Sequence, residues 1–224
     1  MQRVTAILFD FDHTLGIDHH LEHDVFAQLA AQNCAHVPAA PDIDTALARF
    51  RTGEVPLDQV LMDSFRQWGC AASRASEIPA EFRAAALLEA PNRVTPMAGV
   101  PEMLLGLRAR GTTLAILSNG WTELQVLKAK LIDFPGPVFV SEQIGAWKPD
   151  RRAFSIAAND LNVEFTSILY VGDDPTVDVA GAKGAGMRAA WADFDHKEYP
   201  PKIVPPDLVI RAWREFDKGL GEFR

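Results

Sequence analysis

Cysteine is scarce in this chain of 224 residues, and long apolar runs are missing altogether. Cys34 and Cys70 are the only cysteines and form no C-x-x-C pair. This argues against a disulfide framework or a zinc site and favours a reducing compartment. No apolar run approaches the length of a bilayer-crossing helix, and the first residues lead into a strand-like segment without a signal-peptide layout. We therefore expect a cytoplasmic protein that makes no membrane contact.

Positive charge is also in short supply. The chain holds 22 Lys and Arg against 30 Asp and Glu, which gives a formal net charge of −8. A protein that binds a nucleic-acid backbone needs a basic face, so we expect no nucleic-acid partner. An anionic substrate would have to be attracted by local positive groups and not by the field of the whole molecule.

The most informative stretch runs from Leu8 to Gly16 and reads L-F-D-F-D-H-T-L-G. The short apolar run Val4–Phe9 before its first acid is typical of a buried strand, so Asp10 and Asp12 come at the carboxyl end of that strand. Ligands of open α/β sheets bind at this end of the strands. Buried carboxylates stay ionised only beside a metal, a cation or several hydrogen-bond donors. A pair of turn or capping acids is the structural alternative.

Three later segments repeat the pattern of polar residues after an apolar run or on a nearby loop. They are Ser118-Asn119-Gly120 after Thr113–Leu117, the loop Trp147-Lys148-Pro149-Asp150, and Gly172-Asp173-Asp174-Pro175 after Ile168–Val171, with Asp178 just beyond. Each segment alone has an ordinary interpretation, such as a capping serine or a surface lysine. A single site at one edge of a parallel sheet accounts for all of them together.

The chain divides into two kinds of sequence. From residue 96 onward strand-like and helix-like segments alternate, which predicts an α/β fold with a parallel sheet. We expect helices near 99–110, 121–131, 150–161 and 176–185, strands near 113–118, 137–141, 167–172 and 187–191, and a short strand Asp207–Ile210 followed by a final helix. Residues 17–95 show helical spacing of apolar residues and no strand alternation, which predicts a four-helix insert.

The ordered set D-x-D-x-T, S-N-G, K-P-D and G-D-D-x-x-x-D resembles the four motifs of the haloacid dehalogenase-like hydrolase superfamily. The stretches Ser141–Phe154 and Val171–Met187 are especially similar to its phosphatase members. The resemblance implies a Rossmann-like parallel-sheet core formed by residues 1–16 and 96–224. It also implies that residues 17–95 are a helical cap inserted after the first motif.

The chemistry of phosphoryl transfer assigns roles to these residues. Asp10 is the candidate nucleophile, through an aspartyl-phosphate intermediate, and Asp12 the general acid and base. Oxygen ligands at two strand ends point to Mg²⁺ held by Asp10 and Asp173, and the resemblance adds the backbone carbonyl of Asp12. Lys148 would offset negative charge and hold a phosphoryl oxygen.

Four further residues complete the predicted site. Ser118 supplies a hydroxyl to the phosphate, and the backbone N–H of Asn119 supplies another donor. Asp174 and Asp178 are candidates for orienting metal-bound water or Lys148. The histidines after the acid pair fit no standard ligand spacing, so we expect no transition-metal site there; they are His13, His19, His20 and His23.

Several functions share this scaffold. Haloacid dehalogenases lack the second acid of D-x-D, so Asp12 favours a phosphatase; phosphonatases need a cap lysine, and residues 17–95 contain none. A phosphomutase acting on sugar phosphates and a non-catalytic phosphate-binding regulatory domain stay open. We expect a Mg²⁺-dependent phosphomonoester hydrolase for a small phosphorylated metabolite, as a monomer or homodimer.

Overall fold

The computed structural model describes residues 3–221, which form two compact units. The core unit contains the chain up to Ile17 and from Thr95 onward, and the helical unit contains Asp18–Val94. Two short strands, β2 (Gly16–Ile17) and β3 (Thr95–Pro96), pair antiparallel at the points where the chain leaves and re-enters the core unit. The two connections between the units therefore start from neighbouring strands.

A six-stranded parallel sheet forms the centre of the core unit, within residues 3–221. Its order is β5-β4-β1-β6-β7-β8. The strands are β1 (Ala6–Phe9), β4 (Thr113–Ser118), β5 (Val138–Val140), β6 (Ile168–Gly172), β7 (Arg188–Ala192) and β8 (Leu208–Ile210). The chain runs outward from β1 in one direction through β4 and β5 and in the other through β6, β7 and β8. Sheets of this kind bind ligands where the strand order reverses, and the predicted Rossmann-like α/β class is confirmed.

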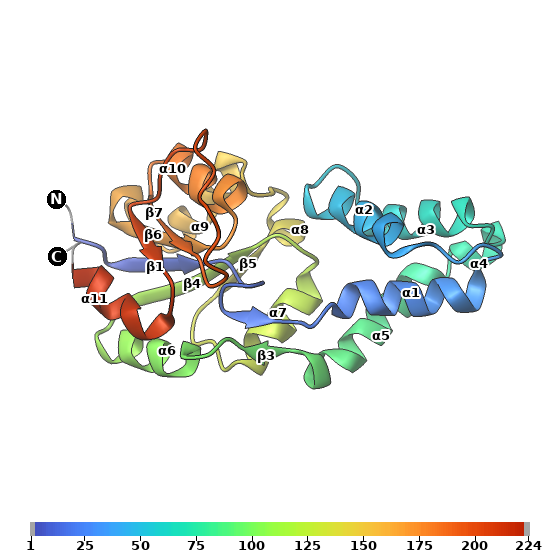
Figure 1. Cartoon of the computed structure of the whole chain (residues 1–224), viewed down its shortest axis with the longest axis horizontal. Coiled ribbons are helices and arrows are strands. Elements are labelled where there is room, and N and C mark those ends of the chain that lie inside the picture. The colour runs from blue at the N-terminus through green and yellow to red at the C-terminus, as the bar shows by residue number, and fades with distance from the viewer. Residues whose placement is uncertain (1–2, 222–224) are drawn as a thin grey trace. The chain divides into compact units, whose positions relative to one another are not determined.

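Helices cover both faces of this sheet (Figure 1). On one face α9 (Arg151–Asp160) and α10 (Ala180–Ala185) pack their alanines and Phe154 against alternate strand residues such as Leu8 and Tyr170. On the opposite face, Phe9 contacts Trp213 and Phe216. The other elements of the unit are α6 (Val100–Ala109), α7 (Thr122–Leu131), α8 (Ser141–Ile144), η1 (Phe165–Ser167), the π-turn η2 (Pro175–Val179), η3 (Trp213–Glu215) and α11 (Phe216–Leu220). Burial on both faces explains why the strands are mostly apolar.

The helical unit contains five helices within Asp18–Val94, one more than the sequence predicts. They are α1 (Leu21–Asn33), α2 (Ala40–Arg51), α3 (Leu57–Gln67), α4 (Ala72–Ala75) and α5 (Ile78–Arg93). The extra helix α4 is a single turn, too short to produce a periodic apolar pattern. Stacked and edge-on aromatic rings of Phe26, Phe65 and Phe82 form the centre of the unit. Among residues 3–221, none of the helices combines the length and apolar character that a bilayer crossing requires.

Candidate active site

The carboxyl edge of the sheet brings the predicted site residues together. Phe9 pairs with Ile116 of β4 and with Val171 of β6, so Asp10, Ser118 and Asp173 all follow at the same edge. Asp10 and Ser118 are buried. The parallel register thus places three residues from distant parts of the sequence at one location, as the sequence predicts.

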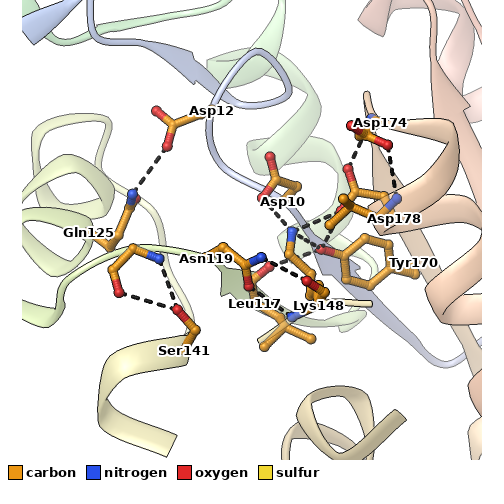
Figure 2. A network of polar contacts seen from close by, with 12 residues as sticks. Asp10, Asp12, Leu117, Asn119, Gln125, Ser141, Lys148, Tyr170, Asp174 and Asp178 are labelled. Carbon is orange, nitrogen blue, oxygen red and sulfur yellow. Dashed lines mark hydrogen bonds and ion pairs between the residues drawn. The ribbon is translucent and has the colours of Figure 1, made fainter. Parts of the chain in front are cut away.

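Lys148 lies at the centre of a buried polar network (Figure 2). Its Nζ donates to Asp10 Oδ1 at 2.7 Å, to Asp178 Oδ1 at 2.8 Å and to the Tyr170 hydroxyl at 2.7 Å. An ammonium group has three donors, and each has a partner here. Burial alone would lower the pKa of Lys148, but the neighbouring carboxylates of Asp10 and Asp178 raise it well above its ordinary value. The lysine is therefore a fixed positive charge.

Two groups hold Lys148 in this position. The side-chain amide of Asn119 binds both backbone groups of the lysine: Lys148 N–H donates to Asn119 Oδ1 at 2.9 Å, and Asn119 Nδ2 donates to the Lys148 carbonyl at 2.9 Å. Tyr170 fixes the other end of the side chain, because its hydroxyl donates to the Leu117 carbonyl at 2.9 Å while it accepts from Nζ. The Asn119 side chain thus anchors the lysine loop, a role the sequence did not predict for it.

Three carboxylates form a compact acidic group beside the lysine. Oxygens of Asp10, Asp173 and Asp178 lie within 4.8 Å of one another. Burial raises the pKa of Asp10 to about 7, with Lys148 opposing the shift and Asp178 and Asp12 adding to it. Burial and the charges of Asp10 and Asp178 raise the pKa of Asp173 to about 8. Buried acids that repel one another in this way are stabilised by a cation.

The donor set of this acidic group fits a hard divalent cation. It offers carboxylate oxygens alone, which suit Mg²⁺ or Ca²⁺ better than zinc or copper. Among residues 3–221, it is the one grouping of three or more His, Cys, Asp or Glu side chains close enough to share an ion, so the histidines that follow Asp12 form no such site. Asp178, predicted only as an orienting residue, belongs to this group directly.

The two neighbouring acids after β6 have different surroundings. Asp178 is buried; its Oδ1 accepts from Lys148, and its Oδ2 accepts from the Asp174 N–H at 3.1 Å. Asp174 is exposed toward solvent and caps η2, because its Oδ1 accepts from the N–H groups of Thr176 and Val177 at 2.7 and 2.8 Å. Asp178 therefore contributes charge to the site, whereas Asp174 shapes the turn that presents it.

Asp12 points away from the acidic group and toward helix α7 (Figure 2). Lys128 Nζ lies 2.9 Å from Asp12 Oδ1, and Gln125 Nε2 donates to Asp12 Oδ2 at 3.1 Å. Lys128 is fully buried, Gln125 is nearly so, and the Asp12 side chain keeps about 33% of its surface exposed. The second acid of the D-x-D pair thus has its own set of partners, separate from those of Asp10.

The residues that sequence reasoning missed are Tyr170, Gln125 and Lys128. Tyr170 occupies an inward position of β6, where an aromatic residue is ordinarily part of the core. Gln125 and Lys128 lie on a helix, where polar residues ordinarily face solvent. Their spacing of three, which places both on one side of α7, was the one signal in the sequence, and it is a weak one.

A small cavity lies beside Asp173 within the core unit. It has a volume of about 210 Å³ and is lined by residues that include His13, Trp191, Asp193 and Lys197. The Trp191 indole donates to the Asp173 carbonyl at 2.9 Å and joins the cavity wall to the acidic group. The cavity has room for a small polar group next to the carboxylates.

Comparison with known proteins gives one family. The protein-family model described as haloacid dehalogenase-like hydrolase matches residues 4–186 of this chain. A phosphoserine phosphatase of Thermus thermophilus is 32% identical over 161 residues, which is 70% of this chain but only 62% of that relative. A glyceraldehyde 3-phosphate phosphatase of Pyrococcus furiosus is 26% identical over 96% of this chain and 95% of its own length.

Solved structures include proteins with a different activity. A 2-haloacid dehalogenase from Pseudomonas syringae superposes with a TM-score of 0.76 at 24% identity, over 99% of this chain and 100% of that chain. At this identity the similarity shows the fold alone. Phosphatases and dehalogenases are thus both among the proteins that this chain resembles.

Proposed function

This chain belongs to the haloacid dehalogenase-like hydrolases, and we propose that within them it is a Mg²⁺-dependent phosphomonoesterase for a small phosphorylated metabolite. The observation that carries the proposal is the contact of Lys148 with both Asp10 and Asp178, beside Asp173. This arrangement combines a carboxylate nucleophile, a fixed cation and a set of oxygen donors at one strand edge.

Asp10 is the nucleophile in this proposal. Its carboxylate attacks the phosphorus, the bond from phosphorus to the leaving oxygen breaks, and an aspartyl phosphate forms that water then hydrolyses. Lys148 offsets charge on the transferring group and holds one of its oxygens. The hydroxyl of Ser118 and the backbone N–H of Asn119, at the strand end before α7, are the further phosphate-binding groups that we assign.

Asp10, Asp173 and Asp178 would hold the magnesium ion, together with the backbone carbonyl of Asp12. When bound, the ion neutralises the repulsion between a carboxylate and a phosphate dianion. The raised pKa values of Asp10 and Asp173 support this assignment, because these two acids lose solvent on burial and repel neighbouring carboxylates.

Asp12 supports a phosphatase over a dehalogenase. A phosphate ester with an alcohol leaving group needs a proton donor, and water attack in the second step needs a proton acceptor. A halide leaves as an anion and needs neither. Asp12 is partly exposed and its carboxylate is separate from the acidic group, so we assign to it the exchange of a proton with the leaving oxygen.

The size of the substrate follows from the core cavity and from the helical unit. The cavity beside Asp173 has room for a small polar group of a substrate. We assign the helical unit, residues 18–94, as a cap, because both of its connections start from the β2–β3 pair next to the first motif. A cap of this kind excludes water and large substrates when it closes.

Both cysteines are free thiols, which agrees with a cytoplasmic location.

The first test is phosphate release from p-nitrophenyl phosphate and a panel of metabolite monophosphates, with Mg²⁺ or with EDTA. We expect metal-dependent turnover that Asp10→Asn reduces by at least about 10³-fold, because it removes the nucleophile. Asp160→Asn, an exposed acid at the end of α9, is the matched control and keeps full activity.

Two outcomes would count against the proposal. Full activity of Asp10→Asn would remove Asp10 as the nucleophile. Release of halide from 2-chloropropionate without added metal, and no release of phosphate, would assign the chain to the dehalogenases instead.

A further inference from the structure

Both oxygens of Asp12 are held by side chains of one helix turn. Lys128 Nζ contacts Oδ1 at 2.9 Å and Gln125 Nε2 donates to Oδ2 at 3.1 Å. Residues 125 and 128 are three apart on α7, so their side chains project from the same side of the helix. A carboxylate bound at one oxygen can still rotate, whereas one bound at both oxygens by two separate groups has a single orientation.

The burial of these two partners makes the arrangement rigid. Lys128 is fully buried, and its Nζ also lies 6.0 Å from the centre of the Phe11 ring. A buried ammonium is costly unless an opposite charge pairs with it, so the position of Lys128 is coupled to that of Asp12. Gln125 is buried too, and a buried amide that leaves its acceptor would forfeit a hydrogen bond that water cannot replace.

Gly120, the last residue of the S-N-G motif before α7, leaves room for the contact between Gln125 and Asp12. A Cβ at Gly120 would lie 2.7 Å from Gln125 Nε2, so any larger residue would displace the amide that holds Asp12. Glu142 of α8 fixes the first turn of the helix, since its Oε2 accepts from the Thr122 N–H at 2.8 Å and from the Thr122 hydroxyl at 2.9 Å. The helix that carries Gln125 and Lys128 is thus itself fixed at its start.

We propose that Gln125 and Lys128 are positioning residues that aim the Asp12 carboxylate at the leaving oxygen of the substrate. The inference rests on the proposed phosphatase function. In that reaction the phosphorus–oxygen bond to the leaving group breaks and the bonding electron pair stays on the leaving oxygen. A proton that the partly exposed Asp12 has taken up from water moves to this oxygen, so that the alcohol departs neutral and Asp12 returns to its carboxylate form. Lys128 keeps its own protons throughout and acts only through Asp12.

The dependence of rate on the leaving group tests this role. A p-nitrophenolate anion departs without a proton, whereas an alkoxide does not, so a misdirected general acid slows alkyl phosphates selectively. We expect Lys128→Met to lower kcat/KM at least about tenfold more for glycerol 2-phosphate than for p-nitrophenyl phosphate. Lys130→Met, an exposed lysine on the same helix, should leave both values unchanged.

Two further variants keep the test decisive if Lys128→Met does not fold. Gln125→Leu removes the other contact without leaving a buried charge, and it should show the same selective loss with a smaller factor. In an Asp12→Asn background, Lys128→Met should add no further selectivity, because its effect passes through Asp12.

The outcomes separate this inference from the proposed function. Equal loss for both substrates in Lys128→Met and Gln125→Leu would mean that the two residues only support the fold, and would overturn the positioning role. If the wild-type protein releases no phosphate with Mg²⁺, the phosphatase proposal itself fails.

Discussion

Gly172, the last residue of β6, gives the acidic group the space that it occupies. A Cβ at this position would lie 2.3 Å from the carboxylate of Asp178, far inside contact distance. Gly172→Ala must therefore move Asp178 away from Lys148 or shift the strand. We expect it to destabilise the protein by about 2 kcal/mol, as overpacking of a buried site does, and to lower kcat/KM by more than about tenfold.

The matched control for this change is Gly184→Ala in α10. Nothing lies within 4 Å of a Cβ built at Gly184, and alanine favours a helix by about 1 kcal/mol over glycine. Urea unfolding and kcat/KM of both variants are the measurements. Equal stability of Gly172→Ala and the wild-type protein would show that the acidic group tolerates a displacement of Asp178.

Individual residues of the site differ in how far their sequence reveals them. Asp10, Lys148 and Asp173 are recognisable because each is a polar residue that follows an apolar run or lies on a short loop. Tyr170 is not, since it has the pattern of a core residue and acts through one hydroxyl. Lys128 is not, because the burial of a charge depends on which element packs over it, and that is a property of the assembled fold.

At the scale of elements, the turn η2 depends on a single cap. Asp174 accepts from the N–H groups of Thr176 and Val177, and this turn carries Asp178 into the acidic group. We expect Asp174→Ala to cost about 1 kcal/mol of stability, the usual effect of a lost cap, and to reduce activity. Asp174→Asn should keep both, because asparagine caps as well as aspartate does.

Thermal unfolding and phosphatase assays of Asp174→Ala and Asp174→Asn decide whether Asp174 acts by capping η2 or through its negative charge. If the negative charge of Asp174 instead orients water on the metal, Asp174→Asn would lose activity while keeping its stability. That result would return Asp174 to the role that the sequence first suggested.

The longer elements of the core unit follow from the sequence, and the short ones do not. The expected strand 113–118 is β4 as observed, and the strand expected near 167–172 is β6, because apolar runs bounded by glycine or polar residues are local signals. The pair β2–β3 and helix α8 span two to four residues, so they form only because distant segments meet. The expected helix 176–185 begins instead as the wider turn η2, from which the Asp178 side chain reaches Lys148.

For the whole molecule, the acidic group couples stability to pH. The pKa values of Asp10 and Asp173 are about 7 and about 8, above the ordinary 3.8. Between pH 4 and 8 the folded protein therefore keeps protons that the unfolded chain has released, so the metal-free protein loses stability as the pH rises through this window. Under the proposed assignment, Mg²⁺ would compete with those protons and restore that stability.

We expect the stabilisation by Mg²⁺ to be small near pH 5 and large near pH 8. At a hundredfold excess over Kd it amounts to about 3 kcal/mol, or roughly 5–10 °C in Tm for a chain of this size. Thermal unfolding with EDTA and with Mg²⁺ at both pH values is the measurement, and Asp173→Asn, which lacks one carboxylate, is the control. Equal stabilisation at the two pH values would mean that the ion binds elsewhere.

The β2–β3 pair makes the helical unit, in topological terms, the loop of a hairpin. Gly16 pairs with Pro96 and Ile17 with Thr95, so the chain returns to the core beside the point where it left. Closing a loop costs entropy that grows only with the logarithm of its length. Residues 18–94 can therefore lengthen, shorten or be exchanged while the central sheet keeps its register. A different insert at this position can therefore change which substrate such a scaffold binds, while the core residues that carry out the reaction stay the same.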